Sequence, residues 1–270
     1  MSFIKTPPIT GMQAAYSVAG KNVVVTGGNR GIGFGISKAF AESGANVAVL
    51  CRNTKSGEEA VSQLKKLGSG KFFTVPCDIA DSDSVKDAAA AVLREFGNVD
   101  VLVNNAGVAT TVPFLSEGGL QEWHRVLDTN LNGTANAVYA FAPAMKEAGR
   151  GGAIINITSI GGDRVSNAKE HDNAPYFCSK AALNKFSEYL AIVLGDYGIR
   201  VNSVAPGPTH SDLDKDLPAN AFEMIENMMP AHRFAEPIEI GALCVFLASP
   251  AGNHVTGQIM THDGGMRIIT

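Results

Sequence analysis

Tyr176 and Lys180 are the two residues in this sequence whose types and spacing best suit acid–base chemistry. On a helix, residues four positions apart share one face and lie one turn from each other. A free phenol has a pKa of about 10 and is a poor acid or base at neutral pH, but a nearby ammonium group favours its ionised form. Lowering that pKa by roughly three units takes about 4 kcal/mol, which requires a closed site and a further positive charge. The same spacing also arises by chance on helix surfaces, so the surrounding motifs decide the interpretation.

The elements that must position this pair alternate between strand and helix along the chain. Short β-branched runs such as 22–26 are typical of strands buried in a parallel sheet. The strands are expected at 22–26, 46–50, 71–75, 100–103, 153–157, 200–204 and 258–261. The helices are expected at 31–43, 57–67, 82–96, 119–146, 238–247 and in the segment that carries Tyr176 and ends near Tyr197. This alternation predicts an α/β fold, a doubly wound parallel sheet with helices on both faces.

The composition indicates a single globular domain that binds neither nucleic acid nor a membrane. Of the 270 residues, 45% are hydrophobic and 18% charged, and the net charge is −4. This balance provides no basic surface for nucleic acid or an anionic membrane, and no apolar run approaches the ~20 residues of a membrane span. We expect an irregular surface arm at 1–19 and one domain at 20–270.

The start of the chain and the cysteines indicate a cytoplasmic protein. Residues 1–19 lack the basic start and apolar centre of a signal peptide. The four cysteines are scattered and form no CxxC pair, as expected of reduced thiols: Cys51, Cys77, Cys178 and Cys244. The six histidines form no metal-binding motif, so we expect no metal site.

A glycine-rich turn, TGGNRGIG, runs from Thr26 to Gly33 between the first strand and the first helix. In parallel sheets of this kind, ligands bind beyond the carboxyl ends of the strands, where the strand order reverses. Glycines permit a tight turn and a close approach of backbone to pyrophosphate, whose charge suits a helix N-terminus. We therefore expect a dinucleotide to contact Gly27, Asn29, Arg30, Gly31, Ile32 and Gly33.

The end of the second strand favours NADP(H) over NAD(H) as that dinucleotide. NAD binders usually place a carboxylate there for the ribose hydroxyls, but this chain has Arg52 and Asn53. The guanidinium groups of Arg52 and Arg30 match a phosphate in a bidentate manner. The alternative is that both are ordinary solvated surface arginines.

Small or polar residues follow the other strands as well. A carboxylate after the third strand can accept a hydrogen bond from the adenine amino group, and a small segment after the fourth lets a ribose lie against the backbone. The backbone after the sixth strand can meet the nicotinamide amide. The expected contacts are Asp78, Ile79, Asn105, Ala106, Gly107, Pro206, Gly207 and Thr209.

Two further polar residues complete the pattern. Asn130 lies inside an expected helix, where asparagine is a poor helix former. Its side chain either has a hydrogen-bonding role or is simply tolerated at this position. Ser159 follows the fifth strand and precedes Tyr176.

Taken together, these motifs closely resemble those of the short-chain dehydrogenase/reductase family. The resemblance covers about 20–266 and rests on TGGNRGIG, CDI, NNAG, Asn130, Ser159, YFCSK and PGPT, followed by VTGQ and DGG near the C-terminus. It implies a Rossmann-type sheet of about seven parallel strands, a substrate lid around 208–232 and a homotetramer, with a dimer as the next possibility. It also implies a catalytic tetrad of Asn130, Ser159, Tyr176 and Lys180, the last two also contacting the cofactor.

The expected reaction is hydride transfer between NADP(H) and a ketone/secondary-alcohol pair. In the reducing direction Tyr176 donates a proton to the carbonyl oxygen, and Ser159 donates a hydrogen bond that stabilises its developing charge. Lys180 would hold the nicotinamide ribose and lower the pKa of Tyr176. The resemblance suggests that Asn130 holds a water that links Lys180 to solvent.

Two segments give conflicting indications about the substrate. The segment between Ser159 and Tyr176 is longer than is usual for this family and unusually polar, which suits a polyol or ketose or simply a solvated loop. The segment after Thr209 is acidic at 212–216 and then rich in methionine and other apolar residues. These apolar residues either favour an alicyclic or steroid-like ketone as substrate or simply pack the lid onto the sheet.

Two other functions compete with this one. A non-catalytic NADP(H) sensor on the same fold could lose Tyr176 or Lys180 without harm, yet both are present. A 3-oxoacyl thioester reductase is the other enzyme hypothesis. The N-terminal arm and the longer loop argue against it, and a basic patch near the cleft, for an acyl carrier, would favour it.

Overall fold

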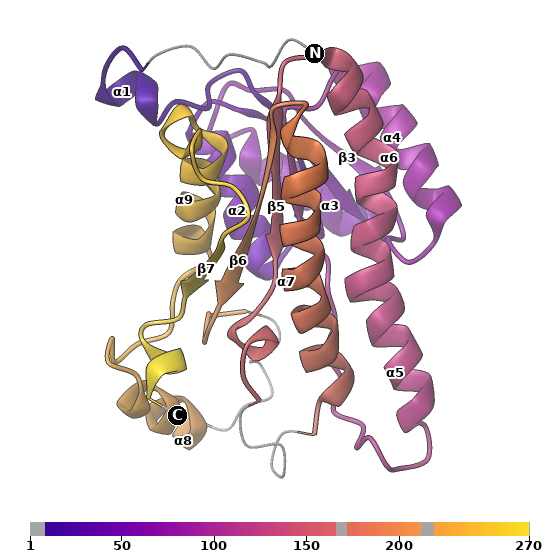
Figure 1. The fold of residues 1–270 in the computed structure, drawn as a ribbon, viewed down its shortest axis with the longest axis vertical. Coiled ribbons are helices and arrows are strands. Elements are labelled where there is room, and N and C mark those ends of the chain that lie inside the picture. Colours follow the sequence, from indigo (N-terminus) through magenta and orange to yellow (C-terminus); the bar gives the residue numbers. More distant parts are fainter. Residues whose placement is uncertain (1–8, 166–171, 212–218, 270) are drawn as a thin grey trace.

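A seven-stranded parallel sheet forms the centre of the molecule in the computed structural model, which describes residues 9–165, 172–211 and 219–269 (Figure 1). The strand order is β3-β2-β1-β4-β5-β6-β7, and every neighbouring pair is parallel. The strands are β1 Asn22–Thr26, β2 Asn46–Cys51, β3 Phe72–Pro76, β4 Val101–Asn104, β5 Gly152–Ile157, β6 Ile199–Pro206 and β7 Ile259–His262. The predicted fold class is confirmed.

The central strands are continuous apolar runs because both faces of the sheet are covered. In β1, the side chains of Val23, Val24 and Val25 are all fully buried. Successive side chains point to opposite faces, so Val23 and Val25 join one core cluster and Val24 joins the other.

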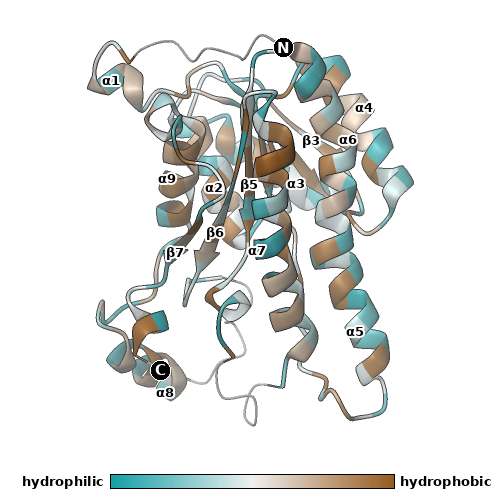
Figure 2. Ribbon diagram, viewed as in Figure 1, coloured by the Kyte–Doolittle hydropathy of each residue, from teal (hydrophilic) through white to brown (hydrophobic). Residues whose placement is uncertain are grey.

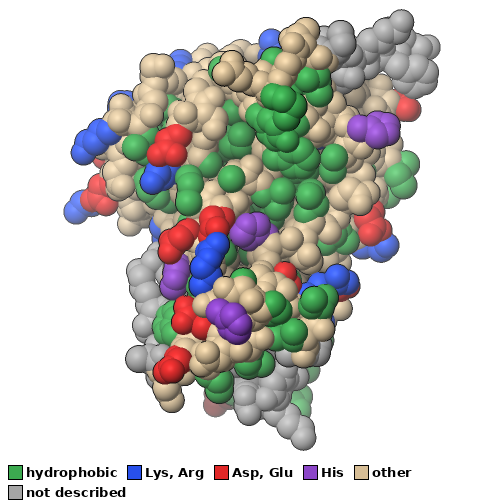
Figure 3. Space-filling view, turned by 90° about the vertical axis from the view of Figure 1, so that its left-hand side faces the viewer, with side chains coloured by type: hydrophobic (Ala, Val, Ile, Leu, Met, Phe, Trp, Pro, Cys, Tyr) green, Lys and Arg blue, Asp and Glu red, His purple; other side chains and the backbone are tan. Residues whose placement is uncertain are grey.

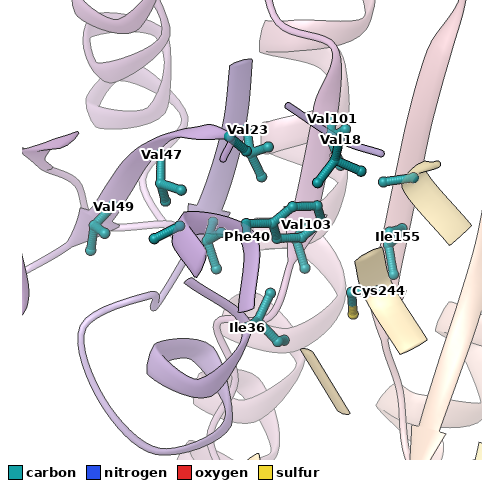
Figure 4. Packing of buried hydrophobic residues seen from close by; sticks show 14 of the residues in the cluster. Val18, Val23, Ile36, Phe40, Val47, Val49, Val101, Val103, Ile155 and Cys244 are labelled. Atoms are coloured by element: carbon teal, nitrogen blue, oxygen red, sulfur yellow. The ribbon is translucent and has the colours of Figure 1, made fainter. Parts of the chain in front are cut away.

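One face of the sheet is covered by α2 (Gly31–Glu42), α3 (Thr54–Leu64) and α9 (Pro237–Ala248). Figure 4 shows the centre of this packing, where side chains of α2 and α9 meet alternate residues of the strands; those labelled include Ile36, Phe40, Val47, Val103, Ile155 and Cys244. Helix α9 is apolar along most of its length (Figure 2), which suits a helix packed against both the sheet and α2.

The other face is covered by α4 (Ser82–Phe96), α6 (Gly133–Ala148) and α7 (Ala174–Gly195), and α5 (Gly119–Leu127) packs against α7. The expected single helix at 119–146 is interrupted by a π-helical turn at Asp128–Asn132. Such turns relax the regular hydrogen-bond ladder and occur often at functional sites. This turn contains Asn130.

The N-terminal arm differs from the irregular surface segment expected at 1–19. Residues 1–8 lie outside the described part, but Met12–Ala15 form the short helix α1. Val18 is fully buried in the core beside the sheet, and the Tyr16 ring lies 6.3 Å from that of Phe246. Apolar burial therefore fastens the arm to the domain.

The strand order reverses between β1 and β4, which lie side by side at the centre of the sheet. Loops from the carboxyl ends therefore converge below the sheet in Figure 1, together with α8 (Ala219–Met228). Short 3₁₀ turns lie at Ile160–Gly162, Pro250–Gly252 and Met266–Ile268. None of the described helices has the length and apolar character needed to cross a bilayer.

Candidate active site

A cavity of about 1330 Å³ opens at the carboxyl ends of the strands. This volume exceeds the roughly 300–1,000 Å³ of a pocket for one drug-sized molecule, as a site for a dinucleotide and a substrate requires. With the exception of Asn130, the predicted site residues all line it: Gly27, Asn29, Arg30, Gly31, Ile32, Gly33, Arg52, Asn53, Asp78, Ile79, Asn105, Ala106, Gly107, Ser159, Tyr176, Lys180, Pro206, Gly207 and Thr209.

The glycine-rich turn leaves no room for a side chain at Gly33. A Cβ atom on Gly33 would lie 2.1 Å from the carbonyl oxygen of Gly27 and 2.4 Å from the Nδ2 atom of Asn105. Gly27 and Gly31 have φ values of 64° and 50°, in the left-handed region that favours glycine. Asn105 Nδ2 donates hydrogen bonds to the carbonyls of Thr26 and Gly27, at 3.0 and 3.3 Å. The end of β4 thus braces the turn after β1.

Thr26 has a structural role that the sequence analysis did not identify. Its hydroxyl accepts hydrogen bonds from the backbone N–H groups of Asn105 and Ala106, both at 3.0 Å. The side chain joins the ends of the two central strands directly beneath the turn. A threonine at the end of a strand gives no signal of this role, because its partners are about 80 residues away in the chain.

The dinucleotide fits this part of the cavity. Helix α2 begins after Arg30 with no side chain of the described residues capping it, so its first N–H groups are available to a phosphate. Arg30 and Arg52 line the cavity at the ends of β1 and β2. Asn53 caps α3 by accepting a hydrogen bond from the Ser56 N–H at 3.0 Å, so this side chain is committed to the helix start. Asp78 accepts a hydrogen bond from the Ala80 N–H at 3.1 Å.

Ser159 caps the short turn at Ile160–Gly162, and its side chain interacts with the Tyr176 phenol. Ser159 Oγ also accepts a hydrogen bond from the Gly161 N–H at 3.0 Å, which fixes its position. Burial raises the pKa of the Tyr176 phenol above its ordinary value, and the hydrogen bond with Ser159 partly offsets this. The lowering expected from Lys180 depends on a further positive charge in the closed site, and within the protein alone desolvation has the larger effect on this pKa.

Lys180 is buried and lies beside the Tyr176 ring. Its Nζ atom is 5.6 Å from the ring centroid and donates a hydrogen bond to the carbonyl oxygen of Ile157 at 2.9 Å. Burial lowers the pKa of this ammonium to about 8. A Cβ atom on Gly107 would lie 3.4 Å from Nζ, so the glycine leaves the ammonium accessible from the cavity.

Asn130 lies fully buried behind the cavity and braces two segments of it. Its Oδ1 atom accepts a hydrogen bond from the Val108 N–H at 2.8 Å, and its Nδ2 atom donates to the Val108 carbonyl at 2.9 Å. Nδ2 also donates to Ser179 Oγ at 3.0 Å, and this hydroxyl donates to the Tyr176 carbonyl at 2.7 Å. The side chain therefore ties the loop after β4 to the start of α7.

The end of the cavity beyond Tyr176 is largely apolar. The side chains there come from the segment after Ser159, from α7, from α8 and from the C-terminal segment: Ile160, Val165, Phe177, Ala221, Met224, Ile225, Met228 and Met266. Neither Val165 nor Met266 was predicted as a site residue. Met266 is separated from the other site residues in the chain and follows no strand directly, so no sequence signal marked it.

Most described polar residues of the long segment after Ser159 contact other parts of the chain. Asp163 forms an ion pair with Arg267. Asp172 accepts a hydrogen bond from the Phe114 N–H at 2.8 Å, and Asn173 accepts one from the Thr110 N–H at 3.3 Å. The predicted polar residues at 169–171 and the acidic residues at 212–216 lie outside the described residues.

Known proteins share both the sequence and this architecture. A family model described as Enoyl-(Acyl carrier protein) reductase matches residues 27–267. The 3-oxoacyl-[acyl-carrier-protein] reductase FabG of Chlamydia muridarum is 39% identical over 246 residues, covering 91% of this chain and 97% of that protein.

Two solved structures illustrate the structural similarity. A short-chain type dehydrogenase/reductase from Mycobacterium marinum is 32% identical with a TM-score of 0.88, over 93% of this chain and 97% of that one. A 7α-hydroxysteroid dehydrogenase solved with NADH and 7-oxo glycochenodeoxycholic acid is 31% identical with a TM-score of 0.88, over 97% and 100%.

Proposed function

Because this chain belongs to the short-chain dehydrogenase/reductase family, we propose that it transfers hydride between NADP(H) and a ketone/secondary-alcohol pair with an apolar body. The observation that carries this proposal is one cavity lined by Ser159, Tyr176 and Lys180 together with the dinucleotide cradle and a group of apolar side chains. A non-catalytic sensor would need the dinucleotide cradle alone.

The roles of the catalytic residues follow from their surroundings. The cofactor supplies or accepts the hydride at the substrate carbon. In the reducing direction Tyr176 donates a proton to the carbonyl oxygen; desolvation raises the pKa of the phenol, which is protonated at neutral pH and available as the donor. Ser159 donates a hydrogen bond to the same oxygen and stabilises the negative charge that develops on it.

Lys180 and Asn130 act around this centre. The Lys180 ammonium faces the cavity beside Gly107, where it would hold the nicotinamide ribose. Its pKa of about 8 leaves it mainly charged at pH 7 and able to exchange a proton near neutrality. Asn130 positions the loop after β4 and the first turn of α7, so its side chain would act mainly as a brace.

Arg30 and Arg52 support NADP(H) rather than NAD(H). Both line the cavity at the end that would receive the adenosine ribose, and no carboxylate follows β2 directly. Guanidinium groups there would bind a 2′-phosphate, whereas a carboxylate would repel it. The choice between NADP(H) and NAD(H) differs among related proteins: the 7α-hydroxysteroid dehydrogenase was solved with NADH, whereas RhlG of Pseudomonas aeruginosa was solved with NADP.

The apolar end of the cavity supports an alicyclic or steroid-like ketone over a polyol or ketose. A polyol would need several hydrogen-bonding partners, because unmet polar groups in a closed site lose about 1–3 kcal/mol each. Asp163, Asp172 and Asn173 are engaged with other parts of the chain, whereas Met224 and Met228 offer adaptable apolar surface.

A 3-oxoacyl thioester reductase is the second candidate, favoured by the 39% identity with FabG. Docking of an acyl carrier would require a basic patch near the cleft. Around the substrate end, Arg164, Arg233 and Arg267 each contact acceptors of this chain, and acidic and basic side chains are intermixed on the lower part of the face in Figure 3. For the part of the cleft that the structure describes, these observations favour a free ketone over a carrier-bound one.

A homotetramer is the assembly we propose, with a dimer as the next possibility. Helix α7 exposes Tyr189, Ile192 and Val193 at 60%, 79% and 39%, and their spacing puts them on one face. Tyr139 on α6 is 80% exposed. Light scattering after size exclusion tests the assembly, and a stable monomer at micromolar concentration would contradict it.

The function is tested by measuring NADPH and NADH consumption across a panel of carbonyl compounds. The panel contains alicyclic diketones, ketosteroids, ketoses and acetoacetyl thioesters, and Tyr176→Phe serves as the inactive control. We expect turnover with NADPH on alicyclic ketones or ketosteroids. A preference for acetoacetyl thioesters would establish the second candidate, and tight NADPH binding without turnover of any class would favour the sensor.

A further inference from the structure

The C-terminal segment folds back onto the segment that follows the catalytic Ser159. We propose that Arg164 is a positioning residue that determines the size of the substrate end of the cavity, because it holds Met266 in the cavity wall. The inference rests on the proposed function, since it concerns which ketones the site accepts. Arg164 would thus influence substrate specificity although it is not one of the four predicted catalytic residues.

The contacts of Arg164 place one guanidinium between two segments that are about 100 residues apart in the chain. Its Nη1 atom donates hydrogen bonds to the carbonyl oxygens of Met266 and Arg267, at 2.9 and 3.1 Å. Arg164 and Met266 both line the cavity. Arg164 follows Ser159 by five positions. One short segment therefore carries both the proposed hydrogen-bond donor to the substrate and the residue that anchors the C-terminal segment 263–269, called the tail below.

The tail has its own internal support, which directs Met266 inward. The Asp263 carboxylate accepts hydrogen bonds from the N–H groups of Gly265 and Arg267, at 3.1 and 2.7 Å. Gly265 has a φ of 87°, and a Cβ atom there would lie 2.7 Å from Pro230. The turn is thus wedged between the end of the lid segment and the loop after β5.

The chemistry of the two side chains explains why they suit this task. The Nη1 atom carries two N–H donors in the plane of the guanidinium, so it bonds two neighbouring carbonyls in a fixed geometry. Methionine is unbranched and adapts to the ligand it contacts. Met266 therefore forms an adjustable wall whose backbone is fixed by Arg164, in the same cavity as Met224 and Met228 of the lid.

The test compares Arg164→Ala, Arg164→Lys and Met266→Ala with wild type over a series of alicyclic ketones of increasing ring size. Arg150→Ala is the control, because Arg150 is also held by a contact within the chain, an ion pair with Asp100 at 3.0 Å, and does not line the cavity. Hydrogen exchange of the peptide 263–269 is measured in parallel with kcat and KM for each ketone.

We expect Arg164→Ala to accelerate exchange in the tail and to raise KM for the smallest ketones about tenfold, with a smaller change in kcat, consistent with the loss of hydrogen bonds to a charged group. The preferred ketone should become larger. Arg164→Lys should show a partial effect, and Met266→Ala should shift the size preference without accelerating exchange.

An Arg164→Ala protein with wild-type exchange, or with an unchanged size preference, would overturn the inference. A wild-type protein that reduces no ketone contradicts the proposed function alone. In that case, unchanged tail exchange in Arg164→Ala still contradicts the anchoring role, and faster exchange supports it.

Discussion

The Nζ atom of Lys180 lies 5.6 Å from the centroid of the Tyr176 ring, inside the same cavity. Burial has opposite effects on the two pKa values: it raises that of the phenol and lowers that of the ammonium to about 8. Both shifts have one cause, because a desolvated site disfavours the charged form of either group. The lysine is thereby brought closer to proton exchange near neutral pH, whereas the phenol stays protonated and available as a proton donor.

Tyr176→Phe should abolish nearly all turnover while the affinity for NADPH stays within about twofold of wild type. The variant removes the proton donor but keeps the ring, and general acid catalysis contributes about 10²–10⁴-fold to a rate. Steady-state kinetics and NADPH fluorescence titration measure the two quantities. Retention of most activity would refute the assignment of Tyr176.

Lys180→Met should alter the pH dependence of stability. In wild type the folded-state pKa of about 8 lies below the unfolded-state value near 10.5, so the unfolded chain binds more protons between these pH values. Stability from this group therefore rises with pH over that window, by about 3 kcal/mol for a shift of this size. Urea unfolding of both proteins from pH 7 to 10.5 should show that the free energy of unfolding of the wild type rises relative to that of the variant. Lys185→Met, at an exposed position on the same helix, should show no such trend.

Gly33→Ala should weaken cofactor binding by at least about tenfold. Its Cβ atom would lie 2.1 Å from the Gly27 carbonyl oxygen, so the turn must open and lose its close fit to a pyrophosphate. Gly195→Ala is the matched control, because a Cβ atom there meets no heavy atom within 4 Å. Calorimetric titration with NADPH measures both variants, and equal affinities would contradict the proposed cradle.

Arg52→Ala and Arg30→Ala should each raise the Kd for NADPH about 10- to 100-fold, the usual effect of losing a hydrogen bond to a charged group. The Kd for NADH should change little, because it lacks the 2′-phosphate. The ratio of the two constants separates phosphate recognition from a general loss of folding. If both constants rise equally, the arginines do not select NADP(H).

The sequence by itself determined the features that depend on short segments. The strands follow from apolar β-branched runs, and the turn after β1 follows from glycines that alone tolerate its backbone. A parallel sheet brings the carboxyl ends of its strands to one edge, so local motifs at these ends, such as those around Gly33, Asn105 and Ser159, had to meet. This is why the cavity lining and the family could be predicted.

Only the tertiary structure decided the features that join remote segments. The π-helical turn around Asn130, the burial of Val18 and the contact of Arg164 with Met266 leave no periodic pattern, because each depends on how separate elements pack. The burial that raises the pKa of Tyr176 in the protein alone belongs to the same group. Spacing along a helix places two groups near each other, whereas their desolvation depends on every element that covers them.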